Sequence, residues 1–166
     1  MQEVILVNEL DECIGQMEKM LAHEEGILHR AFSILIYNSK KEMLLQQRAD
    51  TKYHSPGLWS NACCSHPSPG ENLLDAAKRR LKEELNIECK LIVTGSFIYR
   101  YQFKNKLIEH EYDYVLKGIY DQQPILNEKE VKNFKWMQFE KLLMDIELNP
   151  DNYTFWFKEI LRKNLL

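Results

Sequence analysis

One segment near the middle of the chain has a clear helical pattern, with strand-like segments on both sides of it. Residues 67–87, PSPGENLLDAAKRRLKEELNI, begin with two prolines and a glycine, and apolar side chains recur at helical spacing at Leu74, Ala77, Leu81 and Leu85. A helix with one apolar face buries that face against another layer of structure. The segment therefore predicts a layered fold in which helices cover a sheet.

The segments around this helix are rich in branched and aromatic residues and are bounded by polar turns, as strands are. The expected strands are residues 4–8, 13–18, 29–38, 42–49, 58–64, 90–103, 107–120 and 131–138. The first two should form an N-terminal hairpin, the next two should pair, and the two long ones should form a hairpin around residues 104–106. Helices are expected at 138–146 and 152–164, and a single helical turn at 18–26. This order predicts an α+β fold, with a mixed β-sheet packed between helices.

The chain has no internal repeat or flexible linker, so residues 1–166 are expected to form one domain. Its net charge of −3 argues against nucleic acid as a partner, because nucleic-acid-binding domains carry a basic surplus. No apolar run reaches the roughly 20 residues of a membrane-spanning helix, and the start lacks the features of a secretory signal. We therefore expect no membrane partner and a cytoplasmic location.

The stretch SNACCSHPSPG, residues 60–70, brings two cysteines and a histidine together. Adjacent cysteines rarely bridge each other, because a disulfide needs converging side chains on well-separated backbone positions. Cys64 and His66 are two residues apart, so in an extended segment they should face the same pocket, whereas Cys63 should point the other way into the core. From the residues alone, an inert buried thiol at Cys64 stays open as an alternative.

The central helix carries acidic and basic side chains at helical spacing. Arg79 and Glu83 are four residues apart, as are Arg80 and Glu84, so each pair shares one face. One interpretation is a solvated face with surface ion pairs. The other is a set of carboxylates that binds Mg²⁺ beside a phosphate group. The pattern leaves both open.

This helix resembles the signature of the Nudix superfamily, in which glutamates and an arginine recur at fixed spacing. The matching positions are Glu71, Arg79, Leu81, Glu83, Glu84 and Ile87. Three positions differ: Ser65 and Asn86 replace glycines, and Arg80 replaces a glutamate. The loss of that carboxylate argues against ordinary Nudix hydrolysis of a diphosphate linkage.

The departures resemble one branch of the superfamily, the type 1 isopentenyl-diphosphate isomerases. Segments in that family's order are EKMLAH, LHRAFS, RADTK, PGLWSNACCSHP, RYQ, EHE and FWF, spread over roughly residues 19–157. The resemblance implies a Nudix-like fold and a reaction that interconverts isopentenyl diphosphate and dimethylallyl diphosphate. The expected partner is thus a small-molecule prenyl diphosphate, acted on by a monomer or weak homodimer.

The resemblance also implies a site for one divalent metal. The matching ligands are His23, His29, His66, Glu109 and Glu111. Mixed nitrogen and oxygen donors suit Mn²⁺, Mg²⁺ or Zn²⁺, and Glu109 and Glu111 share one face of their expected strand. A Mg²⁺ that accompanies the substrate diphosphate would be held by Glu84, with the backbone carbonyl of Cys64 as a further ligand.

For catalysis the resemblance implies Cys64 and Glu111 as the proton-transfer groups on opposite sides of the substrate. Tyr101 and Trp156 would present aromatic faces to the carbocation. Lys19, Arg48, Lys52 and Arg80 would hold the diphosphate. Any one of these residues alone would more often be structural or solvent-exposed, so the interpretation depends on the whole set.

Two other functions stay open on the sequence. One is a Nudix hydrolase that cleaves a diphosphate linkage, against which Arg80, Cys64 and Glu111 count. The other is a binding module in which Cys63, Cys64 and His66 coordinate zinc. The lack of a CxxC pair argues against that module.

Overall fold

The chain opens with the predicted N-terminal hairpin, β1 (Glu3–Val7) and β2 (Cys13–Glu18), in the computed structural model, which describes residues 2–166. The side chain of Asn8 closes the turn, because its oxygen accepts hydrogen bonds of 3.0 Å from the backbone N–H groups of Leu10 and Glu12. β1 also pairs with β3 (His29–Tyr37), so the hairpin extends the main sheet.

The centre of the sheet is a parallel pair, β3 and β8 (Ile108–Ile119). Their register runs from His29 opposite Glu111 to Tyr37 opposite Ile119. Strands covered on both faces carry continuous apolar runs, and the middle of β3 is fully buried accordingly. This pairing brings together His29 and Glu111, two residues of the candidate site described below.

The predicted pairing between the strands at 29–38 and 42–49 is present at only one position, Tyr37 opposite Met43. β4 (Glu42–Arg48) pairs instead with β5 (Trp59–Asn61) and β9 (Val131–Gln138). The reason is that β6 (Cys63–Ser65) lies against Phe32 to Ile34 and occupies that edge of β3.

The segment predicted as one extended run at 58–64 is therefore two short strands, β5 and β6, separated at Ala62. The side chain of Asn61 holds the bend, because its amide donates to the carbonyls of Ile34 at 3.1 Å and Cys63 at 3.0 Å. After the bend, Cys63 packs in the core on one side of the sheet and Cys64 against the core on the other.

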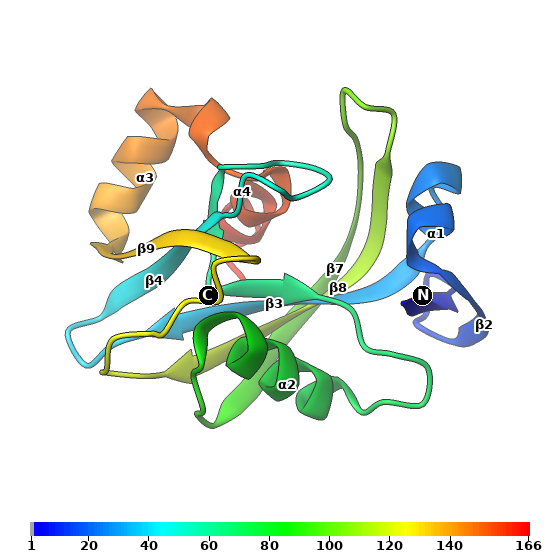
Figure 1. The fold of residues 1–166 in the computed structure, drawn as a ribbon, viewed down its shortest axis with the longest axis horizontal. Coiled ribbons are helices and arrows are strands. Elements are labelled where there is room, and N and C mark those ends of the chain that lie inside the picture. The colour runs from blue at the N-terminus through cyan, green and yellow to red at the C-terminus, as the bar shows by residue number, and fades with distance from the viewer. Residues whose placement is uncertain (1) are drawn as a thin grey trace.

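Helices cover both faces of the sheet (Figure 1). The longest, α2 (Leu73–Leu85), covers one face, while α3 (Phe139–Leu148), the 3₁₀ turn η1 (Pro150–Asn152) and α4 (Phe155–Arg162) cover the other. α1 (Lys19–Glu25) is longer than the predicted single turn and lies beside the N-terminal hairpin. The α+β prediction, with a mixed sheet between helices, is confirmed.

The ends of α2 account for one departure from the Nudix signature. Asn72 caps the first turn, where its side chain accepts from the backbone N–H of Leu74. Asn86 ends the helix in the left-handed region, with φ of 53°. After glycine, asparagine is the usual residue at such a position, so Asn86 can replace the signature's last glycine.

The long hairpin forms as predicted, from β7 (Leu91–Gln102) and β8. Its register places Tyr99 opposite Glu111 and Tyr101 opposite Glu109. Within residues 2–166, no helix has the length and apolar character needed to span a bilayer.

Candidate active site

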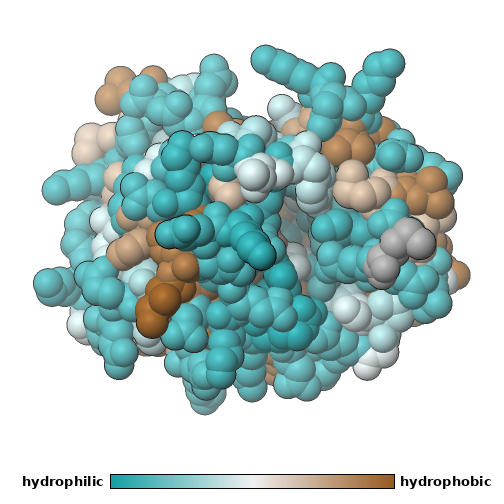
Figure 2. Space-filling model, viewed as in Figure 1, coloured by the Kyte–Doolittle hydropathy of each residue, from teal (hydrophilic) through white to brown (hydrophobic). Residues whose placement is uncertain are grey.

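A cavity of about 120 Å³ opens between the β7–β8 hairpin, α1 and the loop that joins β4 to β5. The mainly hydrophilic face in Figure 2 is hollowed near its middle, in the region between that loop and the hairpin. Most residues that the sequence singles out line this cavity: Lys19, Arg48, Lys52, Cys64, His66, Arg80, Glu109, Glu111 and Trp156.

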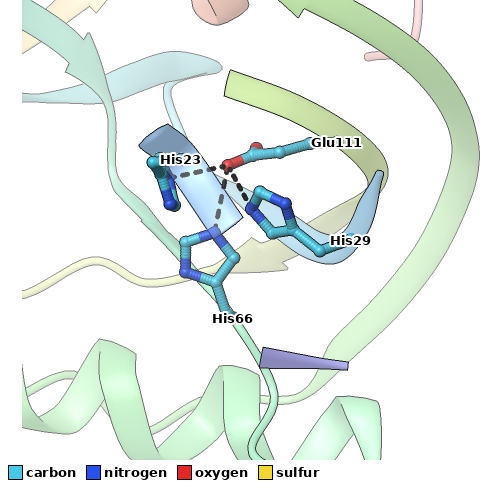
Figure 3. A group of neighbouring side chains, drawn as sticks. All are labelled: His23, His29, His66 and Glu111. Carbon is cyan, nitrogen blue, oxygen red and sulfur yellow. Dashed lines mark hydrogen bonds and ion pairs between the residues drawn. The ribbon is translucent and has the colours of Figure 1, made fainter. Parts of the chain in front are cut away.

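Three histidines converge on one carboxylate oxygen of Glu111, a residue that lines the cavity (Figure 3). The Nε2 atoms of His66, His29 and His23 lie 3.0, 3.6 and 4.0 Å from Oε1 of Glu111. They come from separate elements, since His23 lies on α1, His29 starts β3 and His66 follows β6. All four side chains are buried, and one ligand atom of each lies within 4.8 Å of the others.

The backbone orients two of these rings. Nδ1 of His23 lies 2.7 Å from the carbonyl of Lys19, and Nδ1 of His29 lies 2.8 Å from the carbonyl of Ile27. Each Nδ1 therefore carries the proton, which leaves a lone pair on Nε2. Both Nε2 atoms are buried without a hydrogen-bond partner. Imidazoles held in this way by a backbone carbonyl are typical of metal ligands, so the residues fit a divalent cation.

Glu109, the fifth predicted ligand, lies beside this group and not within it. Its Oε1 is 3.2 Å from Nε2 of His54, and its Oε2 lies 3.0 Å from the hydroxyl oxygen of Tyr99. A ligand atom of Glu109 lies within 4.8 Å of ligand atoms of His23 and His54, which form a second group with it.

The two carboxyl groups have opposite pKa shifts. Burial and the neighbouring charge of Glu111 raise the pKa of Glu109 well above its ordinary value. Burial also opposes ionisation of Glu111, but the neighbouring His29 and His66 outweigh it and lower its pKa. The hydroxyl of Tyr99 joins the pair, because it donates to Oε2 of Glu111 at 2.7 Å.

Cys64 lies on the cavity wall in a network of polar groups. Its thiol donates to Oδ1 of Asn61 at 3.0 Å, and its sulfur accepts from the indole N–H of Trp156 at 2.9 Å. Oγ of Ser33 lies 3.6 Å from the same sulfur. Burial and the nearby Asp113 raise the pKa of the Cys64 thiol to about 12, so the group is neutral in this environment.

The two aromatic residues predicted for the site, Trp156 and Tyr101, lie in different surroundings. Trp156 is 2% exposed and lines the cavity, with the guanidinium of Arg48 5.2 Å from its ring centroid. Tyr101 lies outside the cavity lining, 37% exposed and stacked on Phe155 at 4.2 Å. The register sets Tyr99 opposite Glu111 and carries Tyr101 further towards the hairpin tip, so the role of Tyr101 stays a prediction.

The four basic residues predicted to hold the diphosphate line the cavity, and two of them form ion pairs with acidic side chains. Lys52 forms an ion pair with Glu130, and Arg80 binds Glu84 at 2.6 Å and Glu130 at 3.3 Å. Burial and repulsion by Lys52 and Arg80 lower the pKa of Lys19. Positive charges that repel one another in this way create a site that favours an anion. Glu84 lies behind Arg80, buried and outside the cavity lining.

The polar contacts of the site include residues that were not predicted, namely Tyr99, His54 and Glu130. Tyr99 had a usable signal, since pairing residues 90–103 with 107–120 around the turn at 104–106 sets it opposite Glu111. His54 and Glu130 lie outside the regular elements, on loops that precede β5 and β9. Periodicity says nothing about side-chain direction in such loops, so no sequence signal located them.

Comparison with known proteins identifies the family to which the chain belongs. The NUDIX domain family matches residues 27–157. An isopentenyl-diphosphate Delta-isomerase 2 from Aromatoleum aromaticum is 48% identical over 159 residues, covering 96% of this chain and 84% of that protein. Another from Photorhabdus laumondii is 49% identical over 158 residues, with 95% of this chain and 89% of that protein covered.

Solved structures agree on the fold. A crystallised protein from Deinococcus radiodurans superposes with a TM-score of 0.80 at 23% identity, covering 98% of both chains. A MutT protein from Methanosarcina mazei has a TM-score of 0.65 at 20% identity, with 82% of this chain and 95% of that chain covered. The prediction of a Nudix-like fold is confirmed.

Proposed function

This chain belongs to the isopentenyl-diphosphate Delta-isomerases of the Nudix family, and from that premise we propose how its residues interconvert isopentenyl diphosphate and dimethylallyl diphosphate. Addition of a proton to the terminal alkene carbon generates a tertiary carbocation. A proton then leaves the neighbouring carbon on the diphosphate side, which forms the new double bond. The observation that carries the proposal is that Cys64 and Glu111 line one cavity together with four basic side chains.

Cys64 and Glu111 are the proposed proton-transfer groups. One of the two groups gives a proton to the alkene, and the other accepts the proton that leaves. In the reverse direction the roles exchange, and solvent exchange restores the starting protonation. The hydrogen bond from Trp156 to the sulfur supports this role, because it stabilises negative charge on a thiolate.

One divalent cation is proposed at the histidines, held by His23, His29, His66, Glu109 and Glu111, with Mn²⁺, Mg²⁺ or Zn²⁺ as the alternatives. When bound, such a cation would orient the Glu111 carboxyl group and change its proton affinity. The two unpartnered Nε2 atoms of His23 and His29 support the assignment. Tyr99 donates to Oε2 of Glu111 and so orients this carboxyl group as well.

The diphosphate is proposed to bind at Lys19, Arg48, Lys52 and Arg80. The planar guanidinium of Arg80 can donate paired hydrogen bonds to phosphate oxygens, and Lys52 supplies a compact charge. Glu84 is the proposed protein ligand of the Mg²⁺ that accompanies the diphosphate, together with the backbone carbonyl of Cys64. A positive side chain at position 80 favours retention of the diphosphate over its cleavage.

Trp156 is the proposed aromatic neighbour of the carbocation. A cation over an indole face is stabilised by roughly 2 kcal/mol when water is excluded. Its ring is buried and its N–H is bonded to Cys64, so the ring is held beside the reacting thiol. Tyr101 stays the second proposed aromatic residue, and Tyr99, which the sequence did not single out, also lines the cavity.

The setting of the protein is part of the same proposal. We place its activity in the cytoplasm, with a small prenyl diphosphate as substrate and neither nucleic acid nor membrane as partner. All four cysteines are free, which agrees with a reducing compartment. A monomer or weak homodimer is proposed.

Incubation with isopentenyl diphosphate and Mg²⁺ in D₂O tests the proposal. The expected product is deuterated dimethylallyl diphosphate, with no release of phosphate. Release of phosphate without isomerisation would identify a Nudix hydrolase instead. No turnover, combined with unfolding on chelation, would identify a metal-stabilised binding module.

A further inference from the structure

His54 is a buried histidine next to the proposed metal ligands. It lies on the loop between β4 and β5 and is 6% exposed. Its ring stacks on Phe103, with centroids 4.5 Å apart and planes 17° from parallel, and it meets the ring of Trp156 edge-on at 5.7 Å. Two aromatic neighbours thus fix the orientation of the imidazole inside the site.

The two nitrogens of His54 have unequal surroundings. Nε2 lies 3.2 Å from Oε1 of Glu109, whereas Nδ1 is buried with no hydrogen-bond partner. A polar atom that is removed from water without a partner is unfavourable, and native proteins rarely tolerate one without a reason. The loop therefore brings an imidazole with unused bonding capacity to the edge of the histidine cluster.

His54 belongs to a donor group of its own, with Glu109 and His23. That group shares His23 with the one formed by His29, His66 and Glu111. Nδ1 of His23 faces the Lys19 carbonyl at 2.7 Å, so only its Nε2 has a lone pair, and one lone pair binds one cation. Without His23 the second group keeps only two side chains. The two groups therefore describe one centre and not two independent sites.

We infer that His54 is a sixth donor residue of this single centre, in addition to the three histidines and two glutamates. The inference rests on the proposed metal site. Six protein donors exceed the four of a structural zinc site and suit a six-coordinate cation. Their convergence also accounts for Glu109, whose carboxylate lies nearer to His54 than to the other histidines.

A Mn²⁺ titration of the whole chain, followed by electron paramagnetic resonance, tests the inference on metal affinity. The variants are His54→Ala and His54→Gln. Each is expected to raise the Kd for Mn²⁺ at least tenfold, because even residues outside the ligand shell change metal affinity 10–100-fold. His110→Gln is the matched control, since His110 follows Glu109 on β8 but bonds the Gly26 carbonyl. Its Kd should equal that of the unaltered chain.

The glutamine variant distinguishes ligation from a supporting hydrogen bond. The amide side chain in His54→Gln keeps an N–H donor for Glu109, so near-normal affinity in this variant alone would overturn ligation by His54. Normal affinity in both variants would overturn it as well. Failure of the unaltered chain to bind Mn²⁺ would instead reject the proposed metal site itself.

A measurement on the unaltered chain covers the case in which the variants fail to fold. With ¹⁵N-labelled histidine and bound Mn²⁺, pulsed resonance counts the imidazole nitrogens coupled to the ion. Four coupled imidazoles are expected if His54 is a ligand. Three would overturn the inference while leaving the proposed centre intact.

Discussion

Cys63 and Cys64 are adjacent in the sequence but pack against cores on opposite sides of the sheet. Cys63 is fully buried beneath α2, and Cys64 reaches the cavity, where Asn61 and Trp156 bond its sulfur. The expected alternation of side chains along an extended segment produces this difference. The proposed proton transfer and the core packing thus fall to two neighbouring thiols.

Substitution of the two cysteines should separate these roles. Cys64→Ala is expected to lower kcat/KM by at least about 10²-fold, the usual contribution of a proton-transfer group. Cys63→Ala should leave most of the activity but lower the free energy of unfolding by about 1–2 kcal/mol, because it opens a small void in the core. Isomerase kinetics and urea unfolding of both variants make the comparison. Equal loss of activity in the two would contradict the assignment.

A second residue-scale prediction concerns the hydroxyl of Tyr99. Tyr99→Phe removes the hydroxyl that donates to Oε2 of Glu111 and contacts Oε2 of Glu109, so turnover should fall by about 10–100-fold, the effect of losing a partner of metal-site ligands. Tyr101→Phe should be close to neutral, because that hydroxyl lies outside the cavity lining. Steady-state kinetics measures both variants, and the reverse order of effects would contradict the role of the Tyr99 hydroxyl.

Two residues of the Nudix signature, Glu71 and Arg79, also stabilise the start of the helix α2. Glu71 accepts hydrogen bonds of 2.7 and 2.8 Å from Nε and Nη2 of Arg79, and it also bonds the backbone N–H of Ser68. These bonds tie the segment before α2 to its second turn. The hydrogen bond from Arg79 and the others outweigh burial and lower the pKa of Glu71 below its ordinary value.

The stabilisation from Glu71 should depend on pH. A carboxyl group whose folded pKa is lowered stabilises fully above its unfolded pKa, and loses that effect as pH falls through the folded pKa. Glu71→Gln should therefore lower the free energy of unfolding at pH 7 by about 1 kcal/mol or less, since the pair is partly exposed. The difference should vanish in acid below the folded pKa. Urea unfolding at several pH values measures it, with Glu88→Gln as an exposed control.

At the scale of elements, the positions of helices and strands were predicted more accurately from the sequence than the pairing of the strands. The helix at 67–87 and the long hairpin had strong local patterns, and both are present as α2 and β7–β8. The break at Ala62 and the replacement of β4 by β6 along β3 depend on contacts between distant segments. Local periodicity contains no such information. The same limit explains His54, whose direction is set by packing against Phe103 and Trp156.

The whole molecule brings the metal-site residues together from remote parts of the chain. α1, β3, the segment after β6 and β8 each contribute a proposed ligand, and the parallel pairing of His29 with Glu111 aligns two of them. The resemblance to a family supplied this set of residues, because neither composition nor spacing brings positions 29 and 111 together. A cation bound there would link four elements that the sequence separates.

Such a centre should make the stability of the fold depend on metal. A ligand that binds only the folded state adds about 2.7 kcal/mol at a concentration one hundred times its Kd. Mn²⁺ should therefore raise the unfolding temperature of the chelator-treated protein, and the shift should grow with Mn²⁺ concentration. Glu111→Ala should abolish most of the shift, since three histidines then lose their shared carboxylate. His110→Gln should keep it. Scanning calorimetry gives both values, and equal shifts in the two variants would show that Mn²⁺ stabilises the protein at some other place.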